Sequence, residues 1–302
     1  MNLYIYCQKN SSPTPTQTEL LTTKFDNVFQ IHEADFTDIK NDQSEKIVAL
    51  DPDVIDWKFP NDLIDDIPNL HAICLQTTGY EWIDSNYCRN KNIAVANVPK
   101  YATNAVAEKA LFMALALAKK FPLFAREGKM NWDTEFIGGD IRDKPTDIIG
   151  FGAIGQRLAE ILTPLVGEKE ICYYSRHKQD TKYHYTDFND MLAKSEYMFV
   201  TVAKNNESLA LFDDLSKFNK NMKVVIIANG FEKVAERMAK MVECGDLGGV
   251  AFESNDLSHE YHDNVFVTPP NAYYTADSLV NMFEIWVDTM ISAIDKPKNL
   301  VN

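Results

Sequence analysis

A short apolar run that leads into three closely spaced glycines constrains the fold of this chain more than any other feature. Residues 146–162 read TDIIGFGAIGQRLAEIL, so Gly150, Gly152 and Gly155 directly follow an Ile-Ile pair. After the glycines, apolar residues recur with the period of an amphipathic helix. A strand, a glycine turn and a helix in this order form the context in which a G-x-G-x-x-G pattern indicates dinucleotide binding.

The three glycines have separate roles. Gly150 permits the tight turn, Gly152 lets the backbone approach a pyrophosphate, and Gly155 lets the helix pack against the strand. The N–H groups and the positive end of the helix dipole then face the phosphates. We therefore expect a dinucleotide to contact Gly150, Gly152, Ala153, Ile154 and Gly155. The alternative is a glycine-rich turn of an α/β domain without a ligand.

Apolar runs alternate with helical patterns along the chain, which predicts an α/β protein with parallel sheets. The expected strands lie at 3–7, 47–50, 72–75, 93–98, 148–149, 171–175, 198–202, 224–228, 250–252 and 265–267. Helical patterns cover 104–120, the residues after the glycine turn, 188–192, 234–242 and 278–294. Residues 121–144 are less regular and are interpreted as an arm or linker. The length of 302 residues suits two domains.

Composition excludes several classes of partner. The net charge of −14 argues against nucleic acid, because phosphate binding needs clustered Lys and Arg. The five cysteines are scattered without C-x-x-C spacing, which favours reduced thiols over disulfides or a metal site. The N-terminal residues have neither a basic region nor a long apolar region, so we expect no signal peptide, and the apolar stretch 110–118 is too short to span a membrane. We therefore expect a cytoplasmic protein without a membrane partner.

Four segments together resemble the D-isomer-specific 2-hydroxyacid dehydrogenase family, the relatives of glycerate, D-lactate and phosphoglycerate dehydrogenases. TTGYEWID resembles the family's v-G-y-D-n-i-D segment, and NVPKYATNAVAEKA resembles its n-v-P-x-Y-s-x-n-A-v-A-E segment. Residues 144–155 are similar to its g-K-t-x-G-I-I-G-x-G-x-I-G segment, and VTPPNAYYT stands in place of v-x-T-P-H-x-A. The segments occur in the family's order and spacing, and the similarity covers most of the chain.

This resemblance implies a Rossmann-type, doubly wound parallel sheet inserted in a flavodoxin-like split substrate domain. The substrate domain would comprise residues 1–102 and 273–302, and the NAD(P)-binding domain residues 103–272. The resemblance also implies a homodimer and hydride transfer between nicotinamide and a 2-oxo or 2-hydroxy acid. The substrate-binding positions would be Thr77, Thr78, Gly79 and Tyr101, and further cofactor contacts would be Ala203 and Ala228. For Tyr101, simple packing of the ring is the alternative.

The three catalytic positions of the family are all replaced in this sequence. The arginine that binds the substrate carboxylate becomes Asn229, the glutamate becomes Asn255, and the histidine that exchanges a proton becomes Pro270. Loss of a positioned acid–base group typically lowers the rate by about 10²–10⁴-fold, and loss of an electrostatic stabiliser by about 10²–10³-fold. The resemblance therefore implies impaired reduction of ordinary 2-oxo acids.

Two kinds of compensation stay open at this point. A shifted alignment would make Glu253 or Asp256 the acidic member, against the alternative of a solvated loop carboxylate. Replacement chemistry could instead use a side chain expected near the same edge. The candidates are Tyr101, His259, His262, Tyr273 and Tyr274. A histidine in such a polar loop is more often solvated than a proton donor.

The residues after the second strand of the glycine domain bear on cofactor choice. NAD-binding Rossmann domains usually place a carboxylate there, on the ribose 2′-hydroxyl. This chain has Ser175 instead, followed by Arg176, His177 and Lys178. Because arginine suits phosphate geometry, the sequence favours NADP over NAD, with a solvated basic turn as the alternative. Two functions remain: an oxidoreductase with weak or altered activity, or a non-catalytic NAD(P)-binding regulatory or sensor relative, a pseudoenzyme.

Overall fold

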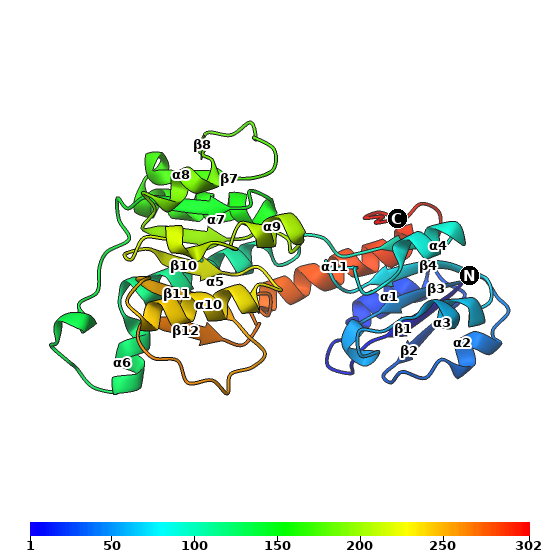
Figure 1. The fold of residues 1–302 in the computed structure, drawn as a ribbon. Coiled ribbons are helices and arrows are strands. Elements are labelled where there is room, and N and C mark those ends of the chain that lie inside the picture. The colour runs from blue at the N-terminus through cyan, green and yellow to red at the C-terminus, as the bar shows by residue number, and fades with distance from the viewer. The chain divides into compact units, whose positions relative to one another are not determined.

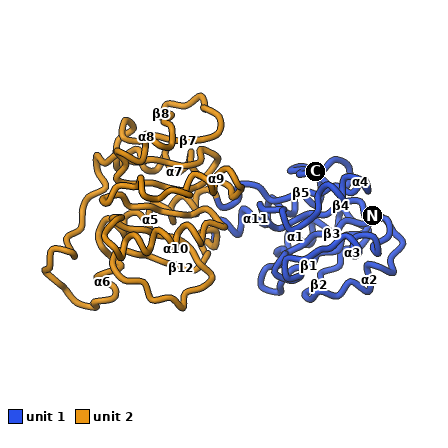
Figure 2. The backbone as a smooth tube through the Cα atoms, in the orientation of Figure 1, with its two compact units in different colours: residues 1–102, 276–302 blue, residues 103–275 orange.

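A computed structural model describes residues 1–302 and divides into two compact units (Figure 2). Unit 1 comprises Met1–Ala102 and Ala276–Asn302, and unit 2 comprises Thr103–Thr275. No helix combines the length and the hydrophobicity needed to traverse a bilayer. The five cysteines form no disulfide.

Unit 1 contains a five-stranded parallel sheet in the order β2-β1-β3-β4-β5 (Figure 1). The strands are β1 (Asn2–Tyr6), β2 (Asn27–Ile31), β3 (Lys46–Leu50), β4 (Leu70–Leu75) and β5 (Ala94–Ala96). The helices are α1 (Pro15–Thr22), α2 (Thr37–Asn41), α3 (Asn61–Asp66), α4 (Ser85–Asn90) and α11 (Ala276–Ser292), with a 3-10 turn η1 (Pro52–Val54).

Apolar side chains cover both faces of this sheet, as expected for parallel strands that helices bury on both sides. Successive strand residues point to opposite faces, so Leu3 belongs to one core cluster and Tyr4 to the other. The cluster around Leu3 also contains Trp286 of α11, which is fully buried. The indole Nε1 of Trp286 donates to the Cys74 carbonyl at 3.0 Å, which anchors α11 to β4.

Unit 2 contains a seven-stranded parallel sheet in the order β12-β11-β10-β9-β6-β7-β8. The strands are β6 (Thr146–Ile149), β7 (Ile171–Tyr174), β8 (His184–Tyr185), β9 (Tyr197–Val200), β10 (Lys223–Ile226), β11 (Gly249–Glu253) and β12 (Val265–Thr268). The helices are α5 (Thr103–Ala118), α6 (Phe121–Glu127), α7 (Ala153–Val166), α8 (Phe188–Leu192), α9 (Asn206–Ala210) and α10 (Glu232–Glu243). The 3-10 turns are η2 (Thr134–Phe136), η3 (Glu168–Glu170) and η4 (Leu215–Lys217).

Helices flank the sheet of unit 2 on both faces. Ile148 of β6 packs in a cluster that includes α5 and α7, whereas Ile149 packs in a cluster that includes α8 and α10. The order of strands reverses at β6, because β7 and β8 lie on one side of it and β9 to β12 on the other. A doubly wound sheet of this kind places its ligand crevice at the carboxyl ends of the strands beside the reversal, here β6 and β9.

The predicted fold class is confirmed: both units are α/β with parallel sheets, and unit 2 has the Rossmann-type arrangement. The strand β2 was not predicted, because this edge strand carries exposed and half-buried residues without a continuous apolar run. The strand β8, which is only two residues long, was not predicted either. Within residues 121–144, interpreted as an irregular arm, the structure contains the short helix α6 and the turn η2.

Candidate functional site

The glycine turn lies between β6 and α7, at the carboxyl edge of the seven-stranded sheet. Gly150 has φ 99°, a left-handed conformation that favours glycine. Its N–H donates to the Tyr174 carbonyl of β7 at 2.8 Å. A Cβ added to Gly150 would lie 2.7 Å from the backbone nitrogen of Val202, which follows β9. Both the backbone angle and the close approach of β9 therefore require glycine at this position.

Gly155 and Gly152 differ in what surrounds them. A Cβ on Gly155 would lie 2.1 Å from the Gly150 carbonyl oxygen and 3.2 Å from Ile148 Cγ2. A Cβ on Gly152 would meet no atom within 4 Å. Gly152 is the N-cap of α7, no side chain caps the first backbone N–H groups of this helix, and the space beside the Gly152 Cα is open. This is the shape that a phosphate group needs at a helix N-terminus.

Two further contacts hold the turn, and neither was predicted. The Thr201 hydroxyl donates to the carbonyls of Gly150 at 2.7 Å and Ile149 at 3.2 Å, which ties the end of β9 to the turn. Phe151, between the first two glycines, stacks on Tyr173 with ring centroids 4.1 Å apart and planes 24° apart. The sequence signal for Thr201 was a hydroxyl residue at the end of a predicted strand. Its partners could not be inferred from the sequence, because Ile149 lies 52 residues and Gly150 51 residues before it.

The predicted basic segment forms the turn after β7. The Ser175 hydroxyl donates to the His177 carbonyl at 2.6 Å, so this side chain shapes the turn. Tyr173 holds the end of this turn, because its hydroxyl accepts from the Gln179 N–H at 2.8 Å and donates to the Gln179 carbonyl at 3.1 Å. Arg176, His177 and Lys178 are exposed. No ion pair occupies Arg176 or Lys178.

The three positions that correspond to the family's catalytic residues follow three neighbouring strands. Asn229 follows β10, Asn255 follows β11, and Pro270 follows β12. Because parallel strands end at one edge, these residues lie along the carboxyl edge of the sheet. Asn229 and Asn255 are exposed and Pro270 is half-buried. None of the three carries a group that titrates or a full charge.

The two acidic alternatives have structural partners. Burial raises the pKa of the Glu253 carboxyl, although its Oε1 accepts from the N–H groups of Asn271 at 3.0 Å and Ala272 at 2.9 Å. Glu253 therefore anchors the loop that follows Pro270. Asp256 lies in the exposed loop after β11, where the hydroxyl and N–H of Ser258 lower the pKa of its carboxyl.

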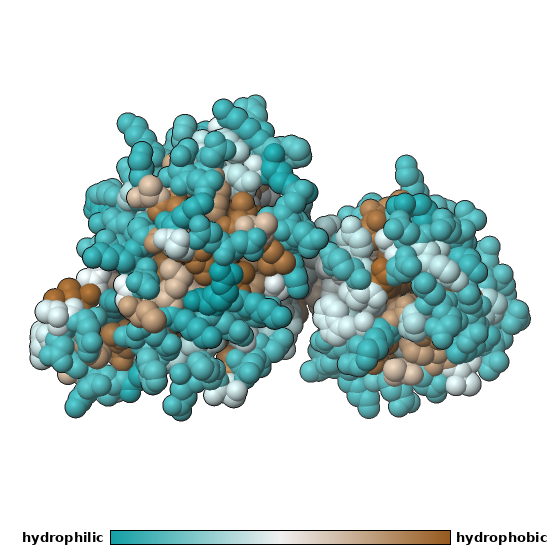
Figure 3. Space-filling view, viewed as in Figure 1, coloured by the Kyte–Doolittle hydropathy of each residue, from teal (hydrophilic) through white to brown (hydrophobic).

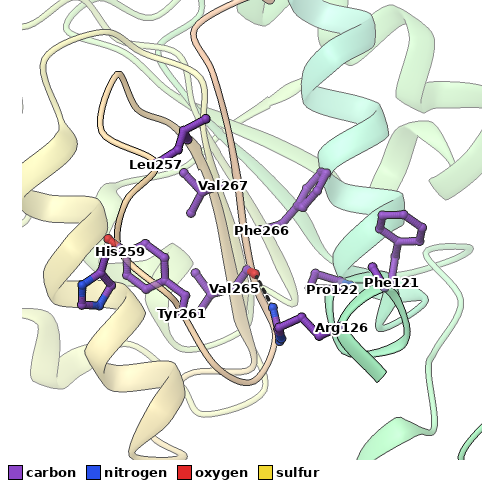
Figure 4. Close-up of a pocket in the computed structure, with 10 residues that line it drawn as sticks. Phe121, Pro122, Arg126, Leu257, His259, Tyr261, Val265, Phe266 and Val267 are labelled. Atoms are coloured by element: carbon purple, nitrogen blue, oxygen red, sulfur yellow. Dashed lines mark hydrogen bonds between the residues drawn. The ribbon is translucent and has the colours of Figure 1, made fainter. Parts of the chain in front are cut away.

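The aromatic alternatives lie in two different places. His259 packs against Tyr261, with ring centroids 4.3 Å apart, beside a hollow of about 260 Å³ (Figure 4). Apolar side chains from α6 and β12 supply most of the lining of this hollow. The backbone N–H of His262 donates to Glu243 Oε1 at 3.3 Å. Tyr273 and Tyr274 are exposed neighbours after β12, with ring centroids 6.0 Å apart.

The predicted substrate-binding residues of unit 1 follow β4 and β5. The Thr77 hydroxyl donates to the Gly79 carbonyl at 2.8 Å, and the Thr78 hydroxyl donates to the Val98 carbonyl at 2.8 Å. These bonds shape the loop at the carboxyl edge of the five-stranded sheet. Tyr101 is half-buried and packs against the cluster that contains Trp286.

The structure contains no group of three or more His, Cys, Asp or Glu side chains that could hold a metal ion. Asp147 of β6 is the carboxylate whose titration is most altered, since burial raises its pKa to about 7. Its position within the strand, 5% exposed, separates it from the carboxyl edge.

Comparison with known proteins gives one family. The model for D-isomer specific 2-hydroxyacid dehydrogenase, catalytic domain, matches residues 14–302. The glyoxylate reductase of Thermococcus litoralis is 26% identical over 269 residues, which cover 81% of this chain and 81% of that protein.

Solved structures have the same fold. An acyclic imino acid reductase in complex with NADPH and D-Arg has a TM-score of 0.76 at 20% identity and covers 100% of both chains. A D-lactate dehydrogenase from Aquifex aeolicus, complexed with NAD and lactic acid, has a TM-score of 0.72 at 20% identity. The second comparison covers 97% of this chain and 95% of that one.

Proposed function

The chain belongs to the D-isomer-specific 2-hydroxyacid dehydrogenase family, and on this premise we propose that it is a nicotinamide-dependent oxidoreductase with weak or altered activity. Its substrate would be a 2-oxo or 2-hydroxy acid. One observation carries the proposal. Gly152 leaves open space at the start of α7, between two glycines that packing requires, whereas the catalytic positions hold Asn229, Asn255 and Pro270.

The residues around the glycine turn fit a dinucleotide. Backbone groups of Gly150, Gly152, Ala153, Ile154 and Gly155 would hold the pyrophosphate, and the ends of β9 and β10 at Ala203 and Ala228 would border the nicotinamide half. When bound, the nicotinamide would donate or accept the hydride. Among the solved structures of the same fold, the acyclic imino acid reductase binds NADPH and the D-lactate dehydrogenase binds NAD.

The remaining site residues would position the substrate without ordinary acid–base help. The amide of Asn229 can donate a hydrogen bond to a substrate oxygen but supplies no full charge. Pro270 has no proton to give to the developing alkoxide. The proton would then come from water or from a neighbouring tyrosine or histidine, which gives the slow rate that we propose.

We propose NADP as the preferred cofactor. Arg176 and Lys178 are exposed, and no ion pair neutralises them. The position at which NAD-binding domains usually carry a carboxylate holds Ser175, so no carboxylate at that position would repel a 2′-phosphate. The Ser175 hydroxyl donates to the His177 carbonyl of its own loop. The competing possibility is a basic turn that is merely solvated.

Unit 1 would be the substrate domain, with Thr77, Thr78, Gly79 and Tyr101 as its contacts with the acid. Their loops lie at the carboxyl ends of β4 and β5, the edge at which α/β sheets bind ligands. We place the protein in the cytoplasm. The five cysteines are scattered without C-x-x-C spacing and three of them are buried, which suits reduced thiols in a reducing compartment.

A homodimer is the expected assembly. Large apolar side chains remain exposed in the segment around α6, and Figure 3 shows apolar patches on the visible face of unit 2. Trp132 is 85% exposed, Ile137 67% and Met130 56%. Exposed apolar area of this kind marks protein–protein interfaces. Sedimentation velocity tests the dimer, and a single monomeric species at all concentrations would contradict it.

A non-catalytic regulatory or sensor relative is the second candidate. Replacement of all three catalytic positions favours it, because a sensor needs only the glycine turn that binds the cofactor. NADPH oxidation with glyoxylate, pyruvate and hydroxypyruvate separates the two candidates. Sustained turnover above the protein-free rate supports the oxidoreductase, whereas tight NADPH binding without turnover on any of these acids supports the sensor. Failure to bind either dinucleotide contradicts both.

A further inference from the structure

Lys204 lies where two neighbouring strands end. It follows β9, and Ile227 at the end of adjacent β10 donates its N–H to the Val200 carbonyl at 3.2 Å. A Cβ placed on Gly230 would lie 2.3 Å from Lys204 Cδ and 3.1 Å from Lys204 Nζ. The stem of Lys204 therefore covers the bare Cα of Gly230, and its ammonium group lies beside the residue that follows Asn229.

Gly230 is suited to this contact. Its φ of 80° is left-handed, and a side chain at this position would displace the lysine. The Gly230 N–H donates to Glu232 Oε1 at 3.1 Å, which fixes the turn at the start of α10. The turn and the lysine thus form one surface at the carboxyl edge.

The charge of Lys204 is not used elsewhere in the structure. Lys204 is exposed, and no ion pair or hydrogen bond involves its ammonium. Lys204 is the only lysine or arginine in the five loops that follow β6, β9, β10, β11 and β12. These loops comprise residues 150–152, 201–205, 227–231, 254–264 and 269–275, respectively. Lys109 of α5 also reaches this edge, but its ammonium donates to Asn271 Oδ1 at 3.0 Å.

We infer that Lys204 binds the carboxylate of the substrate and supplies the positive charge that Asn229 lacks. The inference rests on the proposed function, in which the ligand is a 2-oxo or 2-hydroxy acid. An anion approaching a chain of net charge −14 needs a local cation, and Lys204 provides one beside the predicted carboxylate position. An ammonium is a compact point charge without the planar fork of arginine, so it holds a carboxylate with less control of orientation.

Binding of oxamate, an unreactive analogue of a 2-oxo acid, tests Lys204 without any need for turnover. The full chain is saturated with NADPH, and the dissociation constant of oxamate is measured by fluorescence titration. Because K204M removes a charge-assisted hydrogen bond, it should weaken oxamate binding by about 10–100-fold, which corresponds to about 1.4–2.7 kcal/mol. K204R should stay within about threefold of wild type, since it keeps the charge.

Lys240→Met is the matched control. Lys240 is an exposed lysine near the C-terminal end of α10, so its loss changes the net charge equally but at the opposite end of that helix. This variant should leave oxamate binding unchanged. All three variants should bind NADPH as wild type does. Where turnover is measurable, K204M should raise the KM for glyoxylate more than it lowers kcat.

Three results would overturn the inference. If wild type binds oxamate and K204M binds it equally well, Lys204 is not a carboxylate ligand, although the proposed function stands. If K204M weakens NADPH binding while oxamate binding to the saturated protein is unchanged, Lys204 contacts the dinucleotide instead. If wild type binds neither oxamate nor any tested 2-oxo acid in the presence of NADPH, both the proposed function and this inference are wrong.

Discussion

The two halves of the carboxyl edge of the seven-stranded sheet differ in what they retain. At β6 and β9, the glycine turn is complete, and Thr201 ties it to the neighbouring strand. At β10, β11 and β12, the positions that carry the family's chemistry hold Asn229, Asn255 and Pro270. We refer to these regions as the cradle half and the chemical half.

The contrast shows which of the three glycines indicates a bound ligand and which are required by packing. Packing alone requires Gly150 and Gly155, because an added Cβ would collide with backbone atoms at 2.7 and 2.1 Å. These two glycines would persist in a domain that had lost its ligand. Gly152 has open space around it and an ordinary φ of −77°, so packing does not require glycine there. Gly152 is therefore the glycine that a bound dinucleotide, rather than packing, explains.

Restoring the chemical half should have the largest effect. The triple variant N229R/N255E/P270H introduces the charged and titratable groups that the family uses at these positions. If the cradle half still binds the cofactor productively, kcat/KM for glyoxylate should rise by about 10²–10⁴-fold.

Two measurements keep this prediction interpretable. NADPH binding and thermal melting show whether the triple variant is folded and still binds dinucleotide. A folded variant that binds NADPH but gains no turnover contradicts the idea that the two halves still form one site. The single variants should each gain less than the triple variant, because such groups act as a unit.

Alanine substitutions at Gly152 and Gly155 sharpen the same contrast within the cradle half. G152A adds a methyl group to open space, so we expect a change in unfolding free energy within about 1 kcal/mol. The methyl group would stand where the pyrophosphate approaches, so NADPH binding should weaken by about 100-fold, or about 2.7 kcal/mol.

G155A should show the opposite balance. Its Cβ would lie 2.1 Å from the Gly150 carbonyl oxygen, so the turn must shift, and unfolding free energy should fall by about 3 kcal/mol. Urea unfolding and NADPH titration measure both quantities for each variant. Unchanged NADPH affinity in G152A would remove the main support for the cradle.

Asp147, in the strand β6 that leads into the glycine turn, makes the stability of the folded protein depend on pH. Burial raises its folded-state pKa to about 7 from an ordinary value of 3.8. The unfolded chain loses this proton at lower pH than the folded chain, so Asp147 lowers the stability of the folded protein increasingly as pH rises from about 4 to about 7. Above pH 7 the effect is constant.

The variant D147N measures that cost. The shift between pH 5 and pH 8 corresponds to at most about 2.7 kcal/mol, and we expect the advantage of D147N over wild type to grow by about 2 kcal/mol across this range. D190N, at an exposed position of α8, is the control and should show no such trend. An advantage that does not change with pH would mean that Asp147 is ionised in the folded protein throughout.

Features that depend on neighbouring residues in the sequence could be predicted well. The glycine turn and α8 (Phe188–Leu192) were expected where the structure has them, because local apolar spacing and glycine placement determine them. The C-terminal pattern at 278–294 likewise corresponds to α11, whose apolar face includes Trp286.

Features that depend on contacts between strand ends far apart in the sequence could not be predicted from the sequence. Lys204 meets Gly230 only because β9 and β10 are adjacent, and a glycine gives no sign of which side chain will cover it. Glu253 captures the backbone of Asn271 and Ala272 for the same reason, since β11 and β12 pair across a long loop. In the chemical half, the sequence identified what was missing but not what had taken its place.

Cofactor preference is the smallest expected effect, and it tests the outer edge of the cradle half. Arg176 lies in the exposed turn after β7 without an ion pair, so a 2′-phosphate would gain one charge-assisted contact that a 2′-hydroxyl lacks. At an exposed position this is worth about 1.4 kcal/mol, so R176A should weaken NADPH binding by about tenfold and leave NADH binding nearly unchanged. K169A, which removes an exposed cation just before β7 at the opposite edge of the sheet, should change neither affinity. If R176A loses affinity for NADPH and NADH equally, Arg176 contacts a part that both cofactors share. If the wild-type protein binds NADH more tightly than NADPH, the proposed cofactor preference itself is wrong.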